Sequence, residues 1–165
     1  MPAGETEPTG EHFATGRCTC GAVRYRLTRP PLFVHCCHCR WCQRETGTAF
    51  AINALIESSC VEIEAGEPEI VHTPSNSGEG QHIVRCPDCQ VALWSHYAAA
   101  KERIAFIRVG TLDAPDRLPP DIHIFTESKQ PWVTLNDGKP VMTEYYRRSE
   151  HWPAASVDRY KAALA

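Results

Sequence analysis

Long apolar runs, a basic excess and a secretory leader are all missing from this 165-residue sequence. No stretch of about 18 consecutive apolar residues is present, so we expect no membrane-spanning helix. The formal net charge is -3 at pH 7, so the sequence has no basic excess that would attract nucleic acid. We therefore do not expect nucleic acid as a partner. The N-terminus has neither the basic flank nor the apolar core of a signal peptide, and we therefore expect a cytoplasmic protein.

Cysteine, by contrast, is abundant, with nine residues in the chain. In the absence of an export signal, this content favours reduced thiols and bound metal over disulfides. Four of the nine cysteines lie between residues 35 and 42, together with two of the eight histidines. Cysteines that merely pack in a core are scattered instead. The density of thiols therefore predicts a site for a soft or borderline metal, most simply zinc.

Within this segment, Cys37, Cys39 and Cys42 form a C-x-C-x-x-C set. Side chains of an extended chain alternate between two faces, so Cys37 and Cys39 project to the same side. A turn or a first helical turn after Cys39 brings the third sulfur back towards them. We therefore expect one short segment to supply three ligands to a single ion. The alternative interpretation is a redox-active or structural disulfide knot.

Two further cysteine pairs lie on either side of this segment, Cys18/Cys20 and Cys86/Cys89. The C-x-x-C spacing of the second pair is the usual knuckle of a zinc ribbon. Together the four thiols complete a closed tetrahedral site, which predicts a structural ion that ties the first strand to the middle of the chain. The alternative, a thioredoxin-like dithiol, would need an adjoining βαβ pattern, whereas strand-like segments flank this motif on both sides.

The rest of the chain predicts a mainly β fold with only short helices. About ten short segments have the apolar–polar alternation or the β-branched composition of strands. Residues 60–64 and 69–72 flank Gly66-Glu67-Pro68 and predict a hairpin. We expect a flexible N-terminal segment over residues 1–15, a zinc-binding domain over 16–145, and a C-terminal extension with a short helix over 146–165.

Taken in order, these motifs resemble the glutathione-dependent formaldehyde-activating enzyme family, whose superfamily includes centromere protein V. The resemblance covers about residues 16–142. It rests on Gly-x-Cys-x-Cys-Gly-Ala-Val-x-Tyr from residue 16, C-x-C-x-x-C from residue 37, C-x-x-C from residue 86, and His-x-Phe at 123–125 followed by Ser-Lys and Pro-Trp. It implies coiled antiparallel sheets with a zinc-ribbon element. Two residues depart from the family pattern: Gln90 stands where the family usually has glycine, and Cys36 adds a fourth thiol beside the triplet.

The resemblance also implies two zinc ions per chain. The implied ligands of the structural zinc are Cys18, Cys20, Cys86 and Cys89. The implied ligands of the catalytic zinc are Cys37, Cys39 and Cys42. The implied activity is that of a carbon–sulfur lyase acting on the adduct of a thiol such as glutathione with a small aldehyde such as formaldehyde. A non-catalytic zinc-ribbon binding module and a redox or metal-sensing thiol protein remain as alternatives.

The residue chemistry is consistent with this implication. Three thiolates leave zinc an open position for an incoming thiol, whose pKa the metal would lower. Glutathione is anionic, so we consider Arg40 as a substrate contact, with Arg44 one helical turn away and Lys129 at the family's Ser-Lys position. Each of these side chains has an ordinary solvated role as its alternative.

Three histidines and one further cysteine complete the candidates. His35 and His38 flank the thiols and are interpreted as hydrogen-bond donors near the metal or as its simple neighbours. A ligand role is the less favoured alternative, because the thiols already suffice. His123 is interpreted as an ordinary strand histidine without a role in the site. Cys60, which lies outside all three motifs, is expected in the core.

Overall fold

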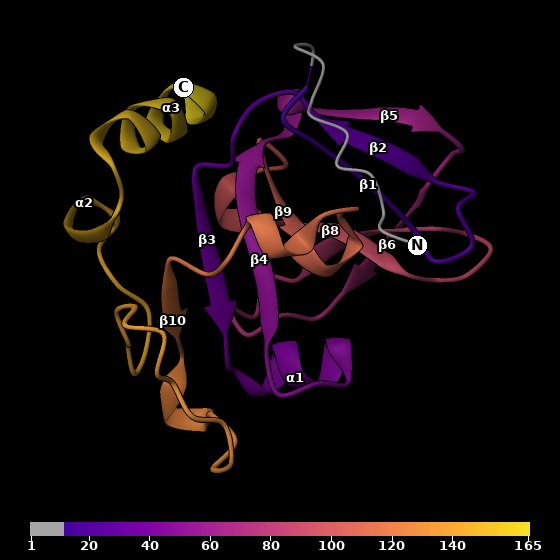
Figure 1. The fold of residues 1–165 in the computed structure, drawn as a ribbon. Helices are drawn as coiled ribbons and strands as arrows, with labels where there is room; N and C mark the ends of the chain where they lie inside the picture. The colour runs from indigo at the N-terminus through magenta and orange to yellow at the C-terminus, as the bar shows by residue number, and fades with distance from the viewer. Residues whose placement is uncertain (1–11) are drawn as a thin grey trace, which may run out of the picture.

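Two β-sheets of unequal size make up most of the fold (Figure 1). The computed structural model describes residues 12–165, and its ten strands confirm the predicted mainly β class. The small sheet has the order β1-β2-β5 and the large sheet the order β10-β3-β4-β9-β8-β7-β6. The strands of the small sheet are β1 (Ala14–Arg17), β2 (Arg24–Leu27) and β5 (Val61–Ala65). Those of the large sheet are β3 (Phe33–Cys37), β4 (Ala51–Glu57), β6 (Glu69–Thr73), β7 (Gln81–Arg85), β8 (Ala92–Tyr97), β9 (Ile104–Arg108) and β10 (Ile122–Ile124).

The α-helices of the described residues are short, as predicted: α1 (Arg40–Thr46), α2 (Arg148–His151) and α3 (Ala154–Leu164). Helix α1 follows β3 directly and ends at Gly47, whose φ of 67° is the left-handed conformation that favours glycine after a helix. Helix α1 therefore holds the third cysteine of the C-x-C-x-x-C set against the end of β3. Among residues 12–165 no helix combines the length and apolarity needed to cross a membrane.

Strand β10 departs from the antiparallel pattern. It pairs in parallel with β3, and its three residues face the last three residues of β3, His35–Cys37. The other strand pairs of both sheets are antiparallel. A parallel pair requires a long crossover, and here most of the chain lies between the two strands. This pairing brings residues 122–124 beside the cysteine-rich segment.

The hairpin predicted from residues 60–64 and 69–72 is wrong. Strand β5 pairs with β2 in the small sheet, whereas β6 pairs with β7 in the large one. Gly66, with a φ of 77°, directs the chain from one sheet to the other. A Cβ atom at Gly66 would lie 2.3 Å from the carbonyl oxygen of Ala22, so the two segments approach more closely than any side chain allows. The turn signal was correct, but the partners of the strands were decided by the tertiary fold.

Buried side chains form two clusters, one between the sheets and one under the C-terminal helices. Tyr25 and Trp94 pack edge to face in the first cluster, at a ring-centroid distance of 5.3 Å. Cys60 is buried in the same cluster, as predicted. The predicted flexible segment over residues 1–15 falls mainly on residues 1–11, which lie outside the described residues, while Ala14 and Thr15 already belong to β1.

The C-terminal segment lies beside β10 and β3 (Figure 1). Trp152 stacks on Phe33 of β3 at a centroid distance of 5.4 Å. Arg159 of α3 donates two hydrogen bonds to the carboxylate of Glu57, at 2.8 and 2.6 Å. Its guanidinium also donates to the carbonyl of Pro30. These contacts join the extension to the large sheet, and its residue Arg148 lines the cavity described next.

Candidate metal centres and the adjoining cavity

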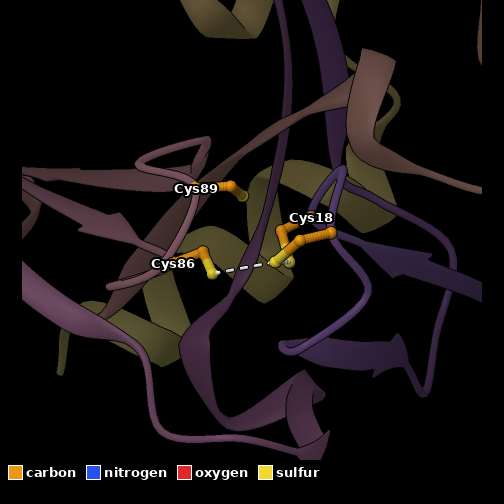
Figure 2. Close-up of side chains that lie close together, drawn as sticks. Cys18, Cys86 and Cys89 are labelled. Carbon is orange, nitrogen blue, oxygen red and sulfur yellow. Dashed lines mark hydrogen bonds between the residues drawn. The ribbon is translucent and has the colours of Figure 1, made fainter.

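The two outer cysteine pairs meet at one point, although 66 residues separate Cys20 from Cys86. The Cys20 sulfur lies 3.4 Å from that of Cys18 and 3.7 Å from that of Cys86. All four sulfurs, including that of Cys89, lie within 4.8 Å of one another. Figure 2 shows Cys18 approaching from one loop and Cys86 and Cys89 from the other. Four thiols with this spacing could hold a metal ion, since sulfurs around a tetrahedral zinc lie about 3.8 Å apart.

Both loops of this cluster have the same backbone construction. Cys18 N–H donates to the carbonyl of Val23, and Cys86 N–H donates to that of Val91, each at 3.1 Å. The residue after the second cysteine has a positive φ in each loop, 78° at Gly21 and 61° at Gln90. Gln90 therefore adopts the left-handed conformation that glycine favours, and its amide donates to Glu69 at 2.7 Å. The departure from the family pattern is thus accommodated without loss of the turn.

The thiols of this cluster shift one another's pKa values, because neighbouring thiolates repel one another. Hydrogen bonds from the backbone N–H groups of Cys20 and Val91 lower the pKa of Cys89 to about 6. The backbone N–H of Ala22 also lowers the pKa of Cys20, but the neighbouring sulfurs outweigh it and raise the pKa to about 12. The pKa of Cys18 is also lowered, so some thiols of the cluster ionise readily while Cys20 resists ionisation. Such a group is suited to a cation that would neutralise its thiolates.

The second cluster consists of Cys37, Cys39 and Cys42, whose sulfurs lie within 4.8 Å of one another. Cys37 ends β3, Cys39 caps the N-terminus of α1, and Cys42 lies in its first turn. The backbone N–H of Cys42 donates to the Cys39 sulfur at 3.3 Å. Hydrogen bonds from Cys37 and Cys42, together with the N–H groups at the start of the helix, lower the pKa of Cys39 to about 2. The segment thus brings together the three predicted ligands, and of these Cys39 is the thiol whose pKa is lowered.

A cavity of about 430 Å³ opens onto this second cluster. All three cysteines line it, on the side of β3 that carries Cys37. Most of its wall is apolar, contributed by Trp41, Tyr97, Phe106, Ile124, Phe125 and Tyr145. An apolar wall around a few convergent polar groups is the usual form of a small-molecule site.

Two arginines line the same cavity, and sequence reasoning identified neither. Arg108 is buried, and its guanidinium donates to Asn53 and, at 3.0 Å, to Ser95. Arg148 lies over the ring of Tyr160 at 4.4 Å. Neither guanidinium forms an ion pair with a carboxylate among residues 12–165. The only acidic lining residue in that range, Glu45, is paired with Arg85. The cavity is therefore apolar, with two guanidinium groups available to an anion.

The cations predicted from the sequence lie elsewhere. Arg40 is on α1 as expected, but its guanidinium donates to Gln43 at 2.9 Å, and it does not line the cavity. Arg44, one turn later, is exposed and also does not line it. The Lys129 ammonium donates to the carbonyls of Gln130 and Val133 at 3.1 and 2.6 Å. Of the cations considered from the sequence, none lines the cavity, whereas Arg108 and Arg148 do.

The histidines of the motif divide between the two faces of β3. His35 lines the cavity, and its Nε2 lies 2.6 Å from the Tyr146 hydroxyl. Burial, with a smaller effect of Arg148, lowers the pKa of His35 to about 3, so the ring is neutral. His38 is fully buried away from the cavity, and its Nε2 lies 3.1 Å from Nδ1 of His123. His123, which was expected to be an ordinary strand histidine, therefore contacts the motif; only the parallel pairing of β10 with β3 could have indicated this.

The chain is similar to several known proteins. Residues 13–128 match the family model described as "Glutathione-dependent formaldehyde-activating enzyme". A Halomonas elongata protein named "Putative glutathione-dependent formaldehyde-activating enzyme" is 29% identical over 154 residues, covering 90% of this chain and 94% of that protein. A crystal structure of a Rhodobacter sphaeroides protein has 17% sequence identity and a TM-score of 0.46, covering 78% of this chain and 98% of that one.

Proposed function

The chain belongs to the glutathione-dependent formaldehyde-activating enzyme family, and we propose that it is a zinc-dependent carbon–sulfur lyase. Its proposed substrates are a thiol such as glutathione and a small aldehyde such as formaldehyde, joined in a hydroxymethyl thioether. The observation that carries this proposal is the position of Cys37, Cys39 and Cys42 on the wall of an apolar cavity that a small adduct can enter. The four-cysteine cluster does not line this cavity and is assigned a structural role.

The donor sets suit two zinc ions per chain, one in each cluster. Four thiols close the first site, whereas three thiols leave a tetrahedral ion one free position at the cavity. When bound there, zinc supplies a Lewis acid that holds the substrate sulfur as a thiolate, lowering the pKa of the thiol. The lowered pKa of Cys39 favours loading of this site at neutral pH, because metal must displace fewer protons.

Arg108 balances the charge of this site. Three thiolates and one divalent ion carry a formal charge of -1, and the substrate thiolate would add another. A hydrogen bond with Cys37 and, more weakly, the buried guanidinium of Arg108 lower the pKa of Cys42, but Cys39 and burial outweigh them and raise it to about 12. Since Arg108 has no carboxylate partner in the described part of the chain, its charge is available to the sulfur cluster.

Arg148 and the apolar wall then position the substrate. A guanidinium without an acidic partner is suited to bind a carboxylate in two hydrogen bonds, and glutathione carries two carboxylates. The rings of Tyr97 and Phe106 pack edge to face at 4.8 Å and exclude water from one side of the cavity. Exclusion of water strengthens the attraction between the arginine and the anion.

His35 offers a donor for the aldehyde oxygen. The indole N–H of Trp152 donates to the Tyr146 oxygen at 2.7 Å, which leaves the Tyr146 hydroxyl hydrogen to donate to Nε2 of His35. The proton of the neutral ring is then on Nδ1.

In the forward direction the thiol sulfur forms a bond to the aldehyde carbon, the carbonyl π bond breaks, and the thiol proton ends on the new hydroxyl oxygen. The reaction therefore releases no net proton.

The proposal is tested by exchange NMR on glutathione and formaldehyde in equilibrium with their adduct. The zinc-loaded chain should accelerate the exchange above the uncatalysed rate. Chelation should remove the acceleration and added Zn²⁺ should restore it. No acceleration with a chain that holds both ions, for glutathione or for smaller thiols, would overturn the lyase proposal and favour a non-catalytic zinc-ribbon module.

A further inference from the structure

We propose a third metal site, formed by Cys36, His38 and His123, that binds a divalent ion of the zinc type. The Cys36 sulfur and one ring nitrogen of each histidine lie within 4.8 Å of one another. None of the three residues lines the cavity that adjoins the second cluster. The site is therefore separate from the one to which lyase activity is assigned, and it does not depend on that assignment.

The backbone places these three residues on one face of the large sheet. Cys36 and His123 are direct partners in the parallel pairing of β3 with β10. Side chains two residues apart in extended chain share a face, so His38 projects to the same side as Cys36. Cys37 and Cys39 occupy the alternate positions and project to the other side, where they line the cavity. One segment thus alternates the ligands of two sites along its length.

The distances suit a tetrahedral ion. The Cys36 sulfur lies 3.5 Å from Nε2 of His38, and this nitrogen lies 3.1 Å from Nδ1 of His123. Around zinc, with bonds of about 2.3 Å to sulfur and about 2.0 Å to nitrogen, sulfur and nitrogen lie about 3.5 Å apart and two nitrogens about 3.3 Å apart. These two separations therefore differ by only a few tenths of an ångström from those around one zinc ion.

Asp137 fixes the nitrogen that His123 presents to the cluster. The Asp137 carboxylate lies 2.8 Å from Nε2 of His123 and accepts the hydrogen of that nitrogen. Nδ1 is then left with its lone pair, directed at His38. A carboxylate behind a histidine ligand is the arrangement that commonly orients metal-bound imidazoles and raises their basicity. Asp137 is itself held by the backbone N–H of Lys139 at 3.1 Å.

Burial and charge favour an ion over a solvated cluster. Cys36, His38 and His123 are 2%, 0% and 5% exposed. One thiolate and the Asp137 carboxylate together neutralise a divalent ion, so the loaded site carries no net formal charge into the protein interior. A cysteine with two histidines is a donor set of intermediate softness, which suits zinc and not calcium or magnesium.

The test is the zinc content of the full chain after loading with excess Zn²⁺ and desalting. We expect three ions in the unaltered chain and two in Cys36→Ala and in His123→Gln. Cys60→Ala, which removes a buried thiol that belongs to none of the clusters, should retain three. Equal zinc content in the unaltered chain and in a folded Cys36→Ala variant would overturn the third site, whatever the total.

A second variant, Asp137→Asn, distinguishes loss of metal from loss of the fold. The Asp137 side chain is 40% exposed, so Asp137→Asn leaves the core in place while it weakens the support of His123. Loss of such a carboxylate typically reduces metal affinity 10- to 100-fold. In competition with a chelator, the third ion alone should leave this variant at a lower chelator concentration. In the cadmium-113 NMR spectrum of the unaltered chain, a third and most shielded resonance should appear that Cys36→Ala lacks. Equal retention of all ions by Asp137→Asn, or the absence of that resonance, would contradict the proposal.

Discussion

Cys36 and Cys37 are adjacent in strand β3, yet their sulfurs belong to different clusters. Because successive side chains of a strand point to opposite faces, Cys37 reaches the cavity while Cys36 faces the histidines behind it. A shift of one residue in the pairing of β3 would exchange the two sulfurs. The pairing of β3 with β4 runs from Phe33 opposite Leu55 to Cys37 opposite Ala51, so it determines which cluster each sulfur joins as well as which side chains form the core.

Replacing Cys86 by serine should unfold most of the chain. Cys86 is fully buried and belongs to the cluster that joins the loops of the small and large sheets. Structural zinc contributes about 10 kcal/mol or more in zinc-finger peptides, whereas whole domains are stable by about 5–15 kcal/mol. Circular dichroism and zinc analysis would measure the loss. Cys60→Ser is the matched control, because it places a hydroxyl in the core at a cost of about 1–3 kcal/mol without removing a ligand. Equal melting temperatures for the two variants would argue against a structural ion.

Cys39→Ala should leave the chain folded but abolish its activity, in contrast to Cys86→Ser. Its cluster lies within six residues and joins no distant strands, so the fold should persist. Loss of the helix cap costs about 0.5–2 kcal/mol, which predicts a modest drop in melting temperature. Thiol–aldehyde turnover should vanish together with one equivalent of zinc. If this variant unfolds while Cys86→Ser remains folded, the roles of the two clusters are reversed.

Arg148→Met should weaken the binding of thiols that carry a carboxylate. Loss of a charged hydrogen bond of about 1.5–3 kcal/mol predicts a KM for glutathione roughly 10- to 150-fold higher. 2-Mercaptoethanol, which has no carboxylate, should be affected far less. Arg147→Met is the control, because Arg147 is exposed, forms a long 3.8 Å pair with Glu150 and does not line the cavity. An equal rise in KM for both thiols would mean that Arg148 shapes the cavity and does not recognise an anion.

The pair of Glu57 and Arg159 should make stability depend on pH. Burial alone would raise the pKa of Glu57, but the hydrogen bonds from Arg159 outweigh it and lower the pKa below its usual value. The pair therefore stabilises the fold fully above the unfolded pKa of about 4.3, and this contribution is lost as pH falls through the lower folded pKa.

Arg159→Met should accordingly cost about 2–3 kcal/mol at pH 7 and progressively less in acid. Urea unfolding of the unaltered chain and of Arg159→Met at each pH gives the difference between their free energies of unfolding. Any loss of metal in acid affects both chains alike and cancels from this difference. Arg29→Met serves as the control, because Arg29 lies 3.9 Å from the same carboxylate, is 53% exposed and should contribute less than about 1 kcal/mol. A difference between the unaltered chain and Arg159→Met that is independent of pH would exclude the ion pair as its cause.

Gly16→Ala should destabilise the small sheet. A Cβ atom at Gly16 would lie 2.5 Å from the ring of Tyr25, which is fully buried and hydrogen-bonded to Thr111 at 2.7 Å. The ring cannot move freely, so we expect a loss of about 1–3 kcal/mol from overpacking. At Gly110 the same methyl group would meet nothing within 4 Å. Gly110→Ala should therefore leave the melting temperature unchanged or slightly higher, and an equal loss in both variants would contradict the clash.

Spacing in the sequence was sufficient to group seven of the cysteines. The C-x-C and C-x-x-C steps reflect local geometry, and the structure brings Cys37, Cys39 and Cys42 together within one segment as predicted. The four outer cysteines also meet. Their grouping was predictable because two thiols alone are too few for a tetrahedral metal site. The number of short strands was also predictable from alternation, whereas the partner of each strand was not: β5 and β6 share a turn but belong to different sheets.

What escaped sequence reasoning depends on contacts between distant segments. His123 reaches Cys36 only because β10 pairs in parallel with β3, and no local pattern indicates such a pairing. Arg148 reaches the cavity from the C-terminal extension, which was assigned outside the zinc-binding domain. Arg40 was preferred because it is adjacent to the cysteines in sequence, but on α1 it faces Gln43.

The separation of the ligands along the chain also determines when each cluster can form during synthesis. Cys37, Cys39 and Cys42 leave the ribosome almost together, whereas Cys18 and Cys20 must wait for Cys89, which follows Cys42 by 47 residues. At about 5–20 residues per second this interval is about 2–10 seconds. During that time Cys18 and Cys20 are thiols without their partners, beside a cluster that can already capture metal. A nascent chain thus completes the ligand set of the proposed catalytic zinc before that of the proposed structural zinc, so we expect a shortage of zinc during synthesis to leave the four-cysteine cluster empty and the chain prone to misfolding.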